Sequence, residues 1–335
     1  MAAVSVRDVA ALAGVSVGTV SNVLNNPQKV SEETAARVQR AIDMLGFVRN
    51  DVARHLRAGH SRTIGLVVLD LSNPFFTSLA RGAEEAAERS NCALLVGNSD
   101  QSNRRENSYL DLFDEQRMRG VLISPAGDVS ARLRRLRDRG TPAVLVDRHS
   151  GLDDYSSVSV DDVAGGRLAA QHLIDQGARR LCFVGGPFEI TQVADRHQGA
   201  AQAVREASGI SMEVLTMPQL TVLQGRAAGE AIRKRPRSEW PDAIFAANDL
   251  LAVGVLQAFV VTGVRVPEDI LLMGYDDIDF ASSAMVPITS IRQPSALIGE
   301  TAVELVLEEA REGTPTGRQV VFQPEIVVRA STAAG

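Results

Sequence analysis

Residues 5–25 most constrain the fold of the first part of this chain, because they describe two short helices that meet at a tight corner. Ser5 is a favoured N-cap residue, and Asp8 follows three positions later in a capping-box arrangement. Gly14 is suited to the left-handed backbone that ends a helix, and Ser16 can cap the next one. The pattern predicts a helix, a corner near 14–16 and a second helix.

The apolar residues of this segment support a small core beneath the corner. In the first helix they fall on one face, and Val15 adds an apolar side chain inside the turn. In the second helix Val20, Val23 and Leu24 point inward. The exposed N-terminal end of the second helix then carries Val17, Gly18, Thr19, Ser21 and Asn22. In a helix-turn-helix, residues at this end reach the edges of bases in the DNA major groove.

The stretches Asp8-Val-Ala-Ala-Leu-Ala-Gly-Val-Ser and Thr19-Val-Ser-Asn-Val-Leu-Asn resemble the start of the lactose-repressor (LacI/GalR) family of bacterial regulators. The resemblance covers essentially the whole chain. It implies a DNA-binding set in the first domain: Ser5, Ser16, Val17, Gly18, Thr19, Ser21, Asn22 and Asn25. Asn22 is suited to reading adenine and Val17 to touching a thymine methyl group. Because Val17 and Gly18 offer no hydrogen-bonding side chain, bending of the DNA and phosphate contacts must add specificity.

A third helix is expected from Ser31 to Leu45, with Ala35, Val38, Ile42 and Leu45 facing the small core and Gly46 ending it. Residues 50–59 form a linker with helical potential, which the family resemblance identifies as a hinge helix. It implies that Ala53 and Leu56 face the DNA minor groove, where a leucine wedge can kink the duplex. A helix this short is marginal without DNA.

Charge is distributed unevenly along the 335 residues, whose net charge is −6. Residues 1–60 hold seven Lys/Arg and five Asp/Glu, which gives +2, so the remainder carries −8. The positive charge is thus local to the proposed DNA reader. No apolar run approaches the ~20 residues of a membrane span, and no signal peptide is evident. Two distant cysteines suit free thiols, so we expect a cytoplasmic protein.

From residue 63 onward, apolar runs alternate with helical stretches, which is typical of doubly wound parallel sheets. The runs are 63–70, 93–96, 120–124, 143–147, 180–185, 243–247 and 270–274. The resemblance implies the two lobes of periplasmic sugar-binding proteins. We therefore expect an all-α headpiece (1–48), a hinge (49–61) and an α/β body (62–335). Lobe 1 would span about 62–161 and 292–322, and lobe 2 about 162–291 and 323–335.

Polar residues follow several of these predicted strands, and ligands of open α/β sheets gather at that edge. Carboxylates and amides suit paired hydroxyls, arginine supplies a rigid donor fork, and an aromatic ring can stack on a sugar. The resemblance implies that the effector-binding residues are Asn73, Phe75, Phe76, Asp147, Arg196, Asn248 and Asp276. Arg148 is a further candidate, with pairing between the lobes as an equal alternative. Each polar residue also has an ordinary structural role open to it, as a turn or a helix cap.

These observations favour a non-enzymatic transcription regulator, most simply a repressor, that binds a palindromic operator as a homodimer. A small effector, expected to be a sugar, would control its DNA affinity; whether it induces or corepresses stays open. No cofactor, metal or membrane partner is expected, because the chain lacks the corresponding motifs. One alternative is a sugar-binding transport protein, which has no use for residues 5–59. Another is a hydrolase using Ser16, since Gly14-Val-Ser-Val-Gly18 matches a nucleophile elbow, although no strand is predicted before it.

Overall fold

The computed structural model describes residues 4–47, 61–149, 155–314 and 316–333. The chain forms two compact units, residues 1–61 and 62–335, which we describe separately. Ala53, Leu56 and the side chain of Asn25 lie outside the described part of the chain, so their proposed roles stay predictions. Within the described ranges, no helix is long and apolar enough to cross a membrane.

The first unit is a set of short helices whose ends are fixed by local capping chemistry. They are α1 (Val6–Ala13), α2 (Val17–Asn25), the 3-10 helix η1 (Pro27–Lys29) and α3 (Glu32–Leu45). The Asp8 carboxylate accepts hydrogen bonds from the Ser5 backbone N–H at 2.8 Å and from its hydroxyl at 2.7 Å. These bonds lower the pKa of Asp8. Gly14 ends α1 with φ 63°, and the Ser16 hydroxyl accepts from the Thr19 N–H at 3.0 Å.

The core of this unit confirms most of the expected inward faces and corrects one of them. Val9 and Val20 are fully buried, and Val38 meets them from α3. The sequence pattern placed Ala35 on the inner face of α3, but the core takes Ala41 instead, while Ile42 and Leu45 pack at its margin. Phe47, two residues beyond the end of α3, is buried and completes this core. In a 14-residue helix the apolar stripe contains more positions than the small core can bury, so tertiary contacts decide which of them face inward.

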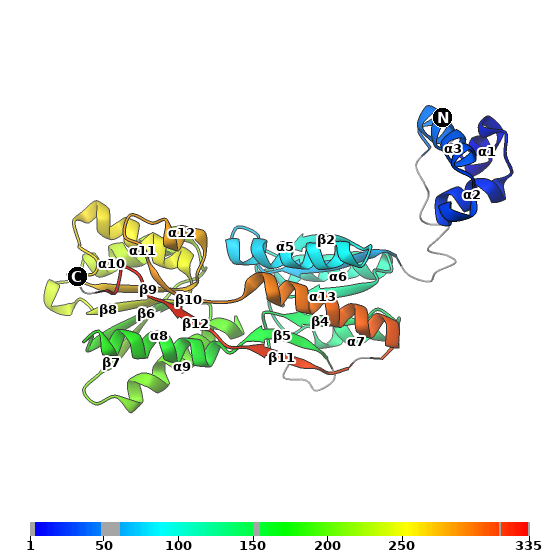
Figure 1. Cartoon of the computed structure of the whole chain (residues 1–335). Coiled ribbons are helices and arrows are strands. Elements are labelled where there is room, and N and C mark those ends of the chain that lie inside the picture. Colours follow the sequence, from blue (N-terminus) through cyan, green and yellow to red (C-terminus); the bar gives the residue numbers. More distant parts are fainter. Residues whose placement is uncertain (1–3, 48–60, 150–154, 315, 334–335) are drawn as a thin grey trace. The chain divides into compact units, whose positions relative to one another are not determined.

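The second unit contains two six-stranded sheets, one in each lobe (Figure 1). The order is β11-β5-β4-β3-β1-β2 in lobe 1 and β12-β10-β9-β8-β6-β7 in lobe 2. Every pairing is parallel except that of β10 with β12. The lobe 1 strands are β1 (Thr63–Val68), β2 (Ala93–Asn98), β3 (Gly120–Ile123), β4 (Ala143–Val146), β5 (Ser157–Val160) and β11 (Gln319–Phe322). The lobe 2 strands are β6 (Arg180–Gly185), β7 (Ser211–Thr216), β8 (Ala243–Ala246), β9 (Leu271–Asp276), β10 (Thr289–Arg292) and β12 (Glu325–Val327).

Helices cover both sheets, as parallel strands require. Lobe 1 carries α5 (Pro74–Arg89), α6 (Asn103–Glu115), α7 (Ser130–Asp138) and α13 (Ser295–Glu312). Lobe 2 carries α8 (Asp162–Asp175), α9 (Thr191–Glu206), α10 (Val222–Arg233), η2 (Arg237–Glu239), α11 (Asp249–Thr262) and α12 (Asp279–Ser282). Gly166 and Gly199 let α8 and α9 approach closely, since a Cβ at either position would lie 1.9 Å from a carbonyl oxygen of the other helix.

The predicted fold class, an α-helical headpiece followed by two doubly wound α/β lobes, is confirmed. All seven apolar runs of the sequence are strands. The pattern missed β5, β7, β10, β11 and β12, which are short or, like β7, mostly exposed at a sheet edge. The chain passes between the lobes three times, after β5, after β10 and between β11 and β12; Figure 1 shows the last crossing in red.

Candidate ligand cavity and nucleic-acid interface

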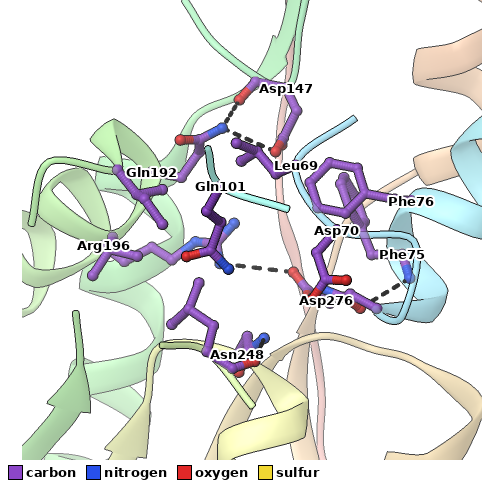
Figure 2. A pocket seen from close by; sticks show the side chains of 14 residues that line it. Leu69, Asp70, Phe75, Phe76, Gln101, Asp147, Gln192, Arg196, Asn248 and Asp276 are labelled. Carbon is purple, nitrogen blue, oxygen red and sulfur yellow. Dashed lines mark hydrogen bonds and ion pairs between the residues drawn. The ribbon is translucent and has the colours of Figure 1, made fainter. Parts of the chain in front are cut away.

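A cavity of about 40 Å³ lies between the two lobes of the second unit (Figure 2). Strand ends deliver its polar residues: Asp70 follows β1, Asp147 follows β4, Asn248 follows β8, and Asp276 ends β9. These are the carboxyl ends of parallel strands, so both sheets present their polar termini to the same space. The cavity is large enough to hold water molecules.

Two pairs of side chains join the lobes directly across this cavity. Asn73 Nδ2 of lobe 1 donates to Asp276 Oδ2 of lobe 2 at 3.0 Å, and both residues are buried. Gln192 Nε2 of lobe 2 donates to Asp147 of lobe 1, both to the backbone carbonyl and, at 3.0 Å, to Oδ2. The cleft is therefore held closed by hydrogen bonds of the kind that a polyhydroxylated ligand makes. A sugar ring that enters must replace these bonds and separate the lobes.

Arg196 is the cation of the site and is almost fully buried. Its Nε donates to Asp162 Oδ1 at 2.8 Å, and its Nη1 donates to the Ala247 carbonyl at 2.8 Å. The same Nη1 lies 3.7 Å from Asp276 Oδ1, and the guanidinium stacks 3.7 Å from the centre of the Tyr275 ring. Burial acts to lower the pKa of Arg196, but the carboxylates of Asp162 and Asp276 outweigh it and raise the pKa. Its fork is thus held rigidly toward the cavity.

Carboxylates outnumber this single arginine. Burial raises the pKa of Asp147 well above its usual range, and the Asp162 carboxylate raises it further. Burial also raises the pKa of Asp276, against the opposing effect of Arg196. The Oδ1 atom of Asp147 is buried and has no hydrogen-bond partner among the described residues. A ligand hydroxyl can donate to this oxygen when the carboxyl is ionised and accept from it when the carboxyl is protonated, which makes Asp147 a natural contact point.

The backbone at both carboxylates is strained. Asp147 has φ 57° and Asp276 has φ 105°, values that favour glycine. Such conformations persist only where the surrounding structure imposes them, and they gather at functional sites. Here they turn each carboxylate from the end of its strand into the cleft.

The asparagines serve two roles at once. Asn73 caps α5 by accepting from the Phe75 N–H at 3.0 Å, while its amide reaches Asp276. Asn248 caps α11 by accepting from the Leu251 N–H at 3.0 Å, and it donates to the Leu220 carbonyl at 3.3 Å. Their structural and ligand-facing roles therefore coexist. Phe75 and Phe76 form the apolar wall of lobe 1, with ring centroids 5.0 Å apart in an edge-to-face arrangement.

The structure brings together seven of the eight effector residues suggested by the sequence. They are Asn73, Phe75, Phe76, Asp147, Arg196, Asn248 and Asp276, all of which line the cavity. Arg148 does not line it: its Nη1 donates to the Gly127 carbonyl at 2.7 Å within lobe 1. This bond does not join the lobes either, so neither role suggested for Arg148 is seen in this conformation.

Sequence reasoning missed Gln192 and Gln101, which also line the cavity. Gln192 lies four residues before Arg196 in α9, so helical spacing puts both side chains on one face. That spacing was an available signal. Gln101 follows β2 in a loop with φ 55°, and no local pattern marks it. The remaining lining residues that the sequence did not single out are Leu69, Asp70, Ile190, Val193 and Leu220.

The outward N-terminal end of α2 is the candidate nucleic-acid interface. Val17, Gly18 and Asn22 are exposed there, and Thr19 is half-buried. The hydroxyls of Ser16 and Thr19 lie 2.9 Å apart and take part in the helix cap, and the Ser5 hydroxyl donates to Asp8. Ser21 is half-buried. Asn22 therefore offers the amide best placed for reading a base edge, since an asparagine can pair bidentately with adenine.

Ser16 does not occupy a nucleophile elbow. Such an elbow needs a strand before the serine, but helix α1 precedes it and helix α2 follows it. Its oxygen accepts from the Thr19 N–H, which is the work of an N-cap. The pattern Gly-x-Ser-x-Gly at 14–18 is thus explained by helix capping.

Comparison with known proteins gives two family matches. Residues 5–50 match "Bacterial regulatory proteins, lacI family", and residues 170–332 match "Periplasmic binding protein-like domain". The "Ribose operon repressor" of Bacillus subtilis (strain 168) is 36% identical over 304 residues, 90% of each chain. The "HTH-type transcriptional repressor PurR" of Vibrio vulnificus (strain CMCP6) is 32% identical over 332 residues, 97% of each chain.

A solved structure with the same architecture is that of the "lac repressor dimer bound to operator and the anti-inducer ONPF". It is 25% identical to this chain and covers 99% of it, with 100% of that structure's chain matched and a TM-score of 0.84. Similarity thus extends over the whole length, through both the helical unit and the two lobes.

Proposed function

This chain belongs to the lacI family of bacterial regulatory proteins, and from that membership we propose that it represses transcription as a dimer bound to a palindromic operator. A small polyhydroxylated molecule, held between the lobes, would set its affinity for DNA. The single observation that carries this proposal is the closed cleft, in which Asn73–Asp276 and Gln192–Asp147 already bridge the lobes through polar groups.

The chemistry of the cavity favours a sugar. Carboxylates accept from vicinal hydroxyls, and the buried oxygen of Asp147 lacks such a donor. Arg196 offers donors to ring or hydroxyl oxygens, and Phe75 or Phe76 offers a face for the apolar side of a ring. One relative is named "Ribose operon repressor", which agrees with a sugar; a nucleobase is the second candidate. The carboxyl groups of Asp70, Asp147 and Asp276 argue for the sugar, because a planar base presents few hydroxyl groups to pair with them.

An apolar surface of lobe 2 supports the proposed dimer. Val261, Phe280 and Met285 are 76%, 55% and 83% exposed, and they line a groove with residues of α10, α11 and α12. Soluble proteins seldom leave such a patch uncovered. A second copy related by two-fold symmetry would bury it. The same symmetry would present two α2 helices to half-sites about one helical turn apart.

Coupling between the cleft and DNA would run through the linker between the two units. We retain the division into a headpiece (1–48), a hinge (49–61) and a body (62–335) as part of the proposal. Separation of the lobes by a sugar would alter how a dimer presents its two hinges, where Ala53 and Leu56 are proposed to meet the minor groove. A coupling of about 1–3 kcal/mol would change DNA affinity by one to two decades. Its sign, induction or corepression, is left to measurement.

The alternatives are less well supported. A transport protein would share the two lobes but would not use the helical unit at residues 5–47. An enzymatic role has no support at Ser16, which acts as a helix cap, and we propose no catalytic activity. A regulator that acts on operators belongs with the chromosome, so we propose a cytoplasmic location.

Selection of bound duplexes from a random pool at near-physiological salt tests the DNA role directly. A palindrome with a deformable centre is the expected product. A thermal-shift screen of pentoses, hexoses and purines then tests the cavity, and operator affinity is measured with and without the best stabiliser. Absence of any sequence preference would overturn the repressor proposal. Equal operator affinity with and without a saturating stabiliser would overturn the coupling.

A further inference from the structure

Three arginines gather at the amino edge of the lobe 1 sheet, opposite the edge that bears the cavity. Arg62 directly precedes β1 and Arg119 directly precedes the neighbouring β3, and the Arg119 N–H donates to the Thr63 carbonyl at 2.8 Å. Arg311 joins them from the last turn of α13. Together with Asn91 and nearby residues they line an open hollow of about 650 Å³. We call these three residues the Arg62 cluster.

No acid among the residues that the structure describes lies within 4.0 Å of the guanidinium groups of this cluster. No ion pair between described residues includes Arg62, Arg119 or Arg311. Other lobe 1 arginines do form ion pairs: Arg89 pairs with Glu300 and Arg139 with Asp114. A group of cations without a counter-ion attracts an anion from outside the unit.

Hydrogen bonds to backbone carbonyls account for only part of the donor capacity of the cluster. Arg62 Nε donates to the Asn91 carbonyl at 2.7 Å, and Arg311 Nε donates to the Leu307 carbonyl at 3.1 Å. Each bond occupies one of the five donors of a guanidinium, so most of the donors stay available. Arg119 is half-buried and makes no side-chain hydrogen bond with a described residue.

We propose that the Arg62 cluster binds phosphate groups of the DNA that the headpiece holds, so that the body adds its own backbone contacts to those of α2. This inference rests on the proposed DNA-binding function. Residues 1–60 supply a net charge of only +2, which is small for a duplex reader. Local cations at the start of the body would supplement that charge although the body as a whole is acidic.

The position of the cluster in the chain favours DNA over a free phosphate. Residues 48–61 join the headpiece to Arg62, and these fourteen residues span at most about 50 Å when fully extended. The start of β1 therefore stays within reach of a duplex bound by the headpiece. Arg62 and Arg311 are exposed and the hollow is wide and open, which suits a backbone that lies across it. A small anion is better held by an enclosed site with buried donors.

The test compares two triple variants of the full chain that lose the same charge. The cluster variant is Arg62→Gln, Arg119→Gln and Arg311→Gln. The control changes three exposed cations of lobe 2 that form no ion pair with a described residue, namely Arg179→Gln, Arg205→Gln and Lys234→Gln. Fluorescence anisotropy gives Kd for the selected operator and for a scrambled duplex over a range of KCl concentrations.

The cluster variant is expected to show a log Kd–log salt slope smaller by about 2 to 3, on both duplexes alike, because phosphates carry no sequence. The wild type would then lose about 16- to 64-fold more affinity than the variant between 50 mM and 200 mM salt. The control variant should keep the wild-type slope. Equal slopes for the cluster and control variants would overturn the proposal.

Two further measurements keep the test decisive. Arg119→Gln alone removes no side-chain hydrogen bond with a described residue and should lower the salt slope by about 1. This single variant therefore tests the proposal even if the triple variant fails to fold. If inorganic phosphate stabilises the wild type but not the cluster variant, while the DNA slopes agree, the cluster binds small anions and the DNA assignment is wrong. If the wild type shows no preference for the operator, but the cluster variant still has a smaller salt slope than the wild type on scrambled DNA, the result counts against the repressor function and not against the cluster.

Discussion

Replacing Asp276 with alanine should remove ligand control while leaving DNA binding in place. Its carboxylate is the hub of the cavity: Oδ2 accepts from Asn73 at 3.0 Å and Oδ1 accepts from Gln293 at 2.8 Å. Arg196 lies 3.7 Å from Oδ1. Both lobes and the buried cation therefore converge on one side chain, which is far from the headpiece in sequence.

The expected size of the effect follows from these contacts. A ligand hydroxyl that replaces Asn73 on Oδ2 gains a hydrogen bond to a charged acceptor, worth about 1.5–3 kcal/mol. Asp276→Ala forfeits that bond, so ligand affinity should fall about 10- to 150-fold. The amides of Asn73 and Gln293 also lose their acceptor, which costs about 1–3 kcal/mol for each group left unpaired. Burial raises the pKa of Asp276, which means that its negative charge is unfavourable in the folded state. Removing that charge therefore offsets part of the cost of the unpaired amides.

Calorimetry with the sugar that best stabilises the wild type measures the first effect, and anisotropy on the operator measures DNA affinity. Asp249→Asn is the matched control, because Asp249 is a buried carboxylate of the same lobe that does not line the cavity. It accepts instead from Ser290 and from the Ile278 N–H. Wild-type ligand affinity in Asp276→Ala, or equal losses in both variants, would refute the reasoning.

Three further predictions test other parts of the site. Gly166→Ala would put a Cβ 1.9 Å from the carbonyl oxygen of Arg196, so it should cost about 1–3 kcal/mol in unfolding free energy, seen by denaturant titration, and weaken ligand binding. Asp147→Asn should stabilise the unliganded protein at neutral pH. Burial, reinforced by the Asp162 carboxylate, raises the pKa of Asp147, so the folded state keeps a proton that the unfolded chain releases near pH 4. The stability of the wild type therefore falls as the pH rises from about 4 toward the raised pKa of the folded state. Asn22→Ala should reduce discrimination between operator and mismatched DNA by about 1–3 kcal/mol in competition binding.

Each of these has a matched control or a contrary outcome. Gly82→Ala crowds α5 against α13 in lobe 1 to a similar degree, with a Cβ 2.1 Å from the Ala296 carbonyl, and should destabilise the fold without changing ligand affinity. Melting temperatures of wild type and Asp147→Asn that move in parallel between pH 5 and 8 would contradict the linkage argument. Unchanged mismatch discrimination in Asn22→Ala would remove that residue from base reading.

The helical unit was predictable because its signals are local. Ser5, Gly14 and Ser16 fix helix ends through bonds that span three or four residues, and such bonds are visible in the sequence. The apolar runs of the parallel strands were equally clear, since a strand buried on both faces needs apolar side chains throughout. The inner face of α3 could not be read from the sequence, because Ala35 and Ala41 are the same residue type and only tertiary packing decides which of them is buried.

The ligand site was predictable as a set of strand ends but not as an arrangement. Neighbouring residues at the end of a strand point to opposite faces, so Asp147 and Arg148 cannot both enter the cleft from an extended strand. Asp147 has a left-handed backbone, with φ 57°, and its carboxylate points into the cavity, while Arg148 donates to the Gly127 carbonyl. No pattern in the sequence records that choice.

The sequence alone determined the helix caps, the seven apolar strands with the helical stretches between them and the chemical types available at the ends of those strands, because these depend on neighbours within a few residues. The tertiary structure decided which of those groups meet. Asn73 finds Asp276 across 203 residues, and Gln192 finds Asp147 across 45. Such partners are set by how two lobes close on each other, a geometry that depends on the packing of the whole body and that leaves no local trace.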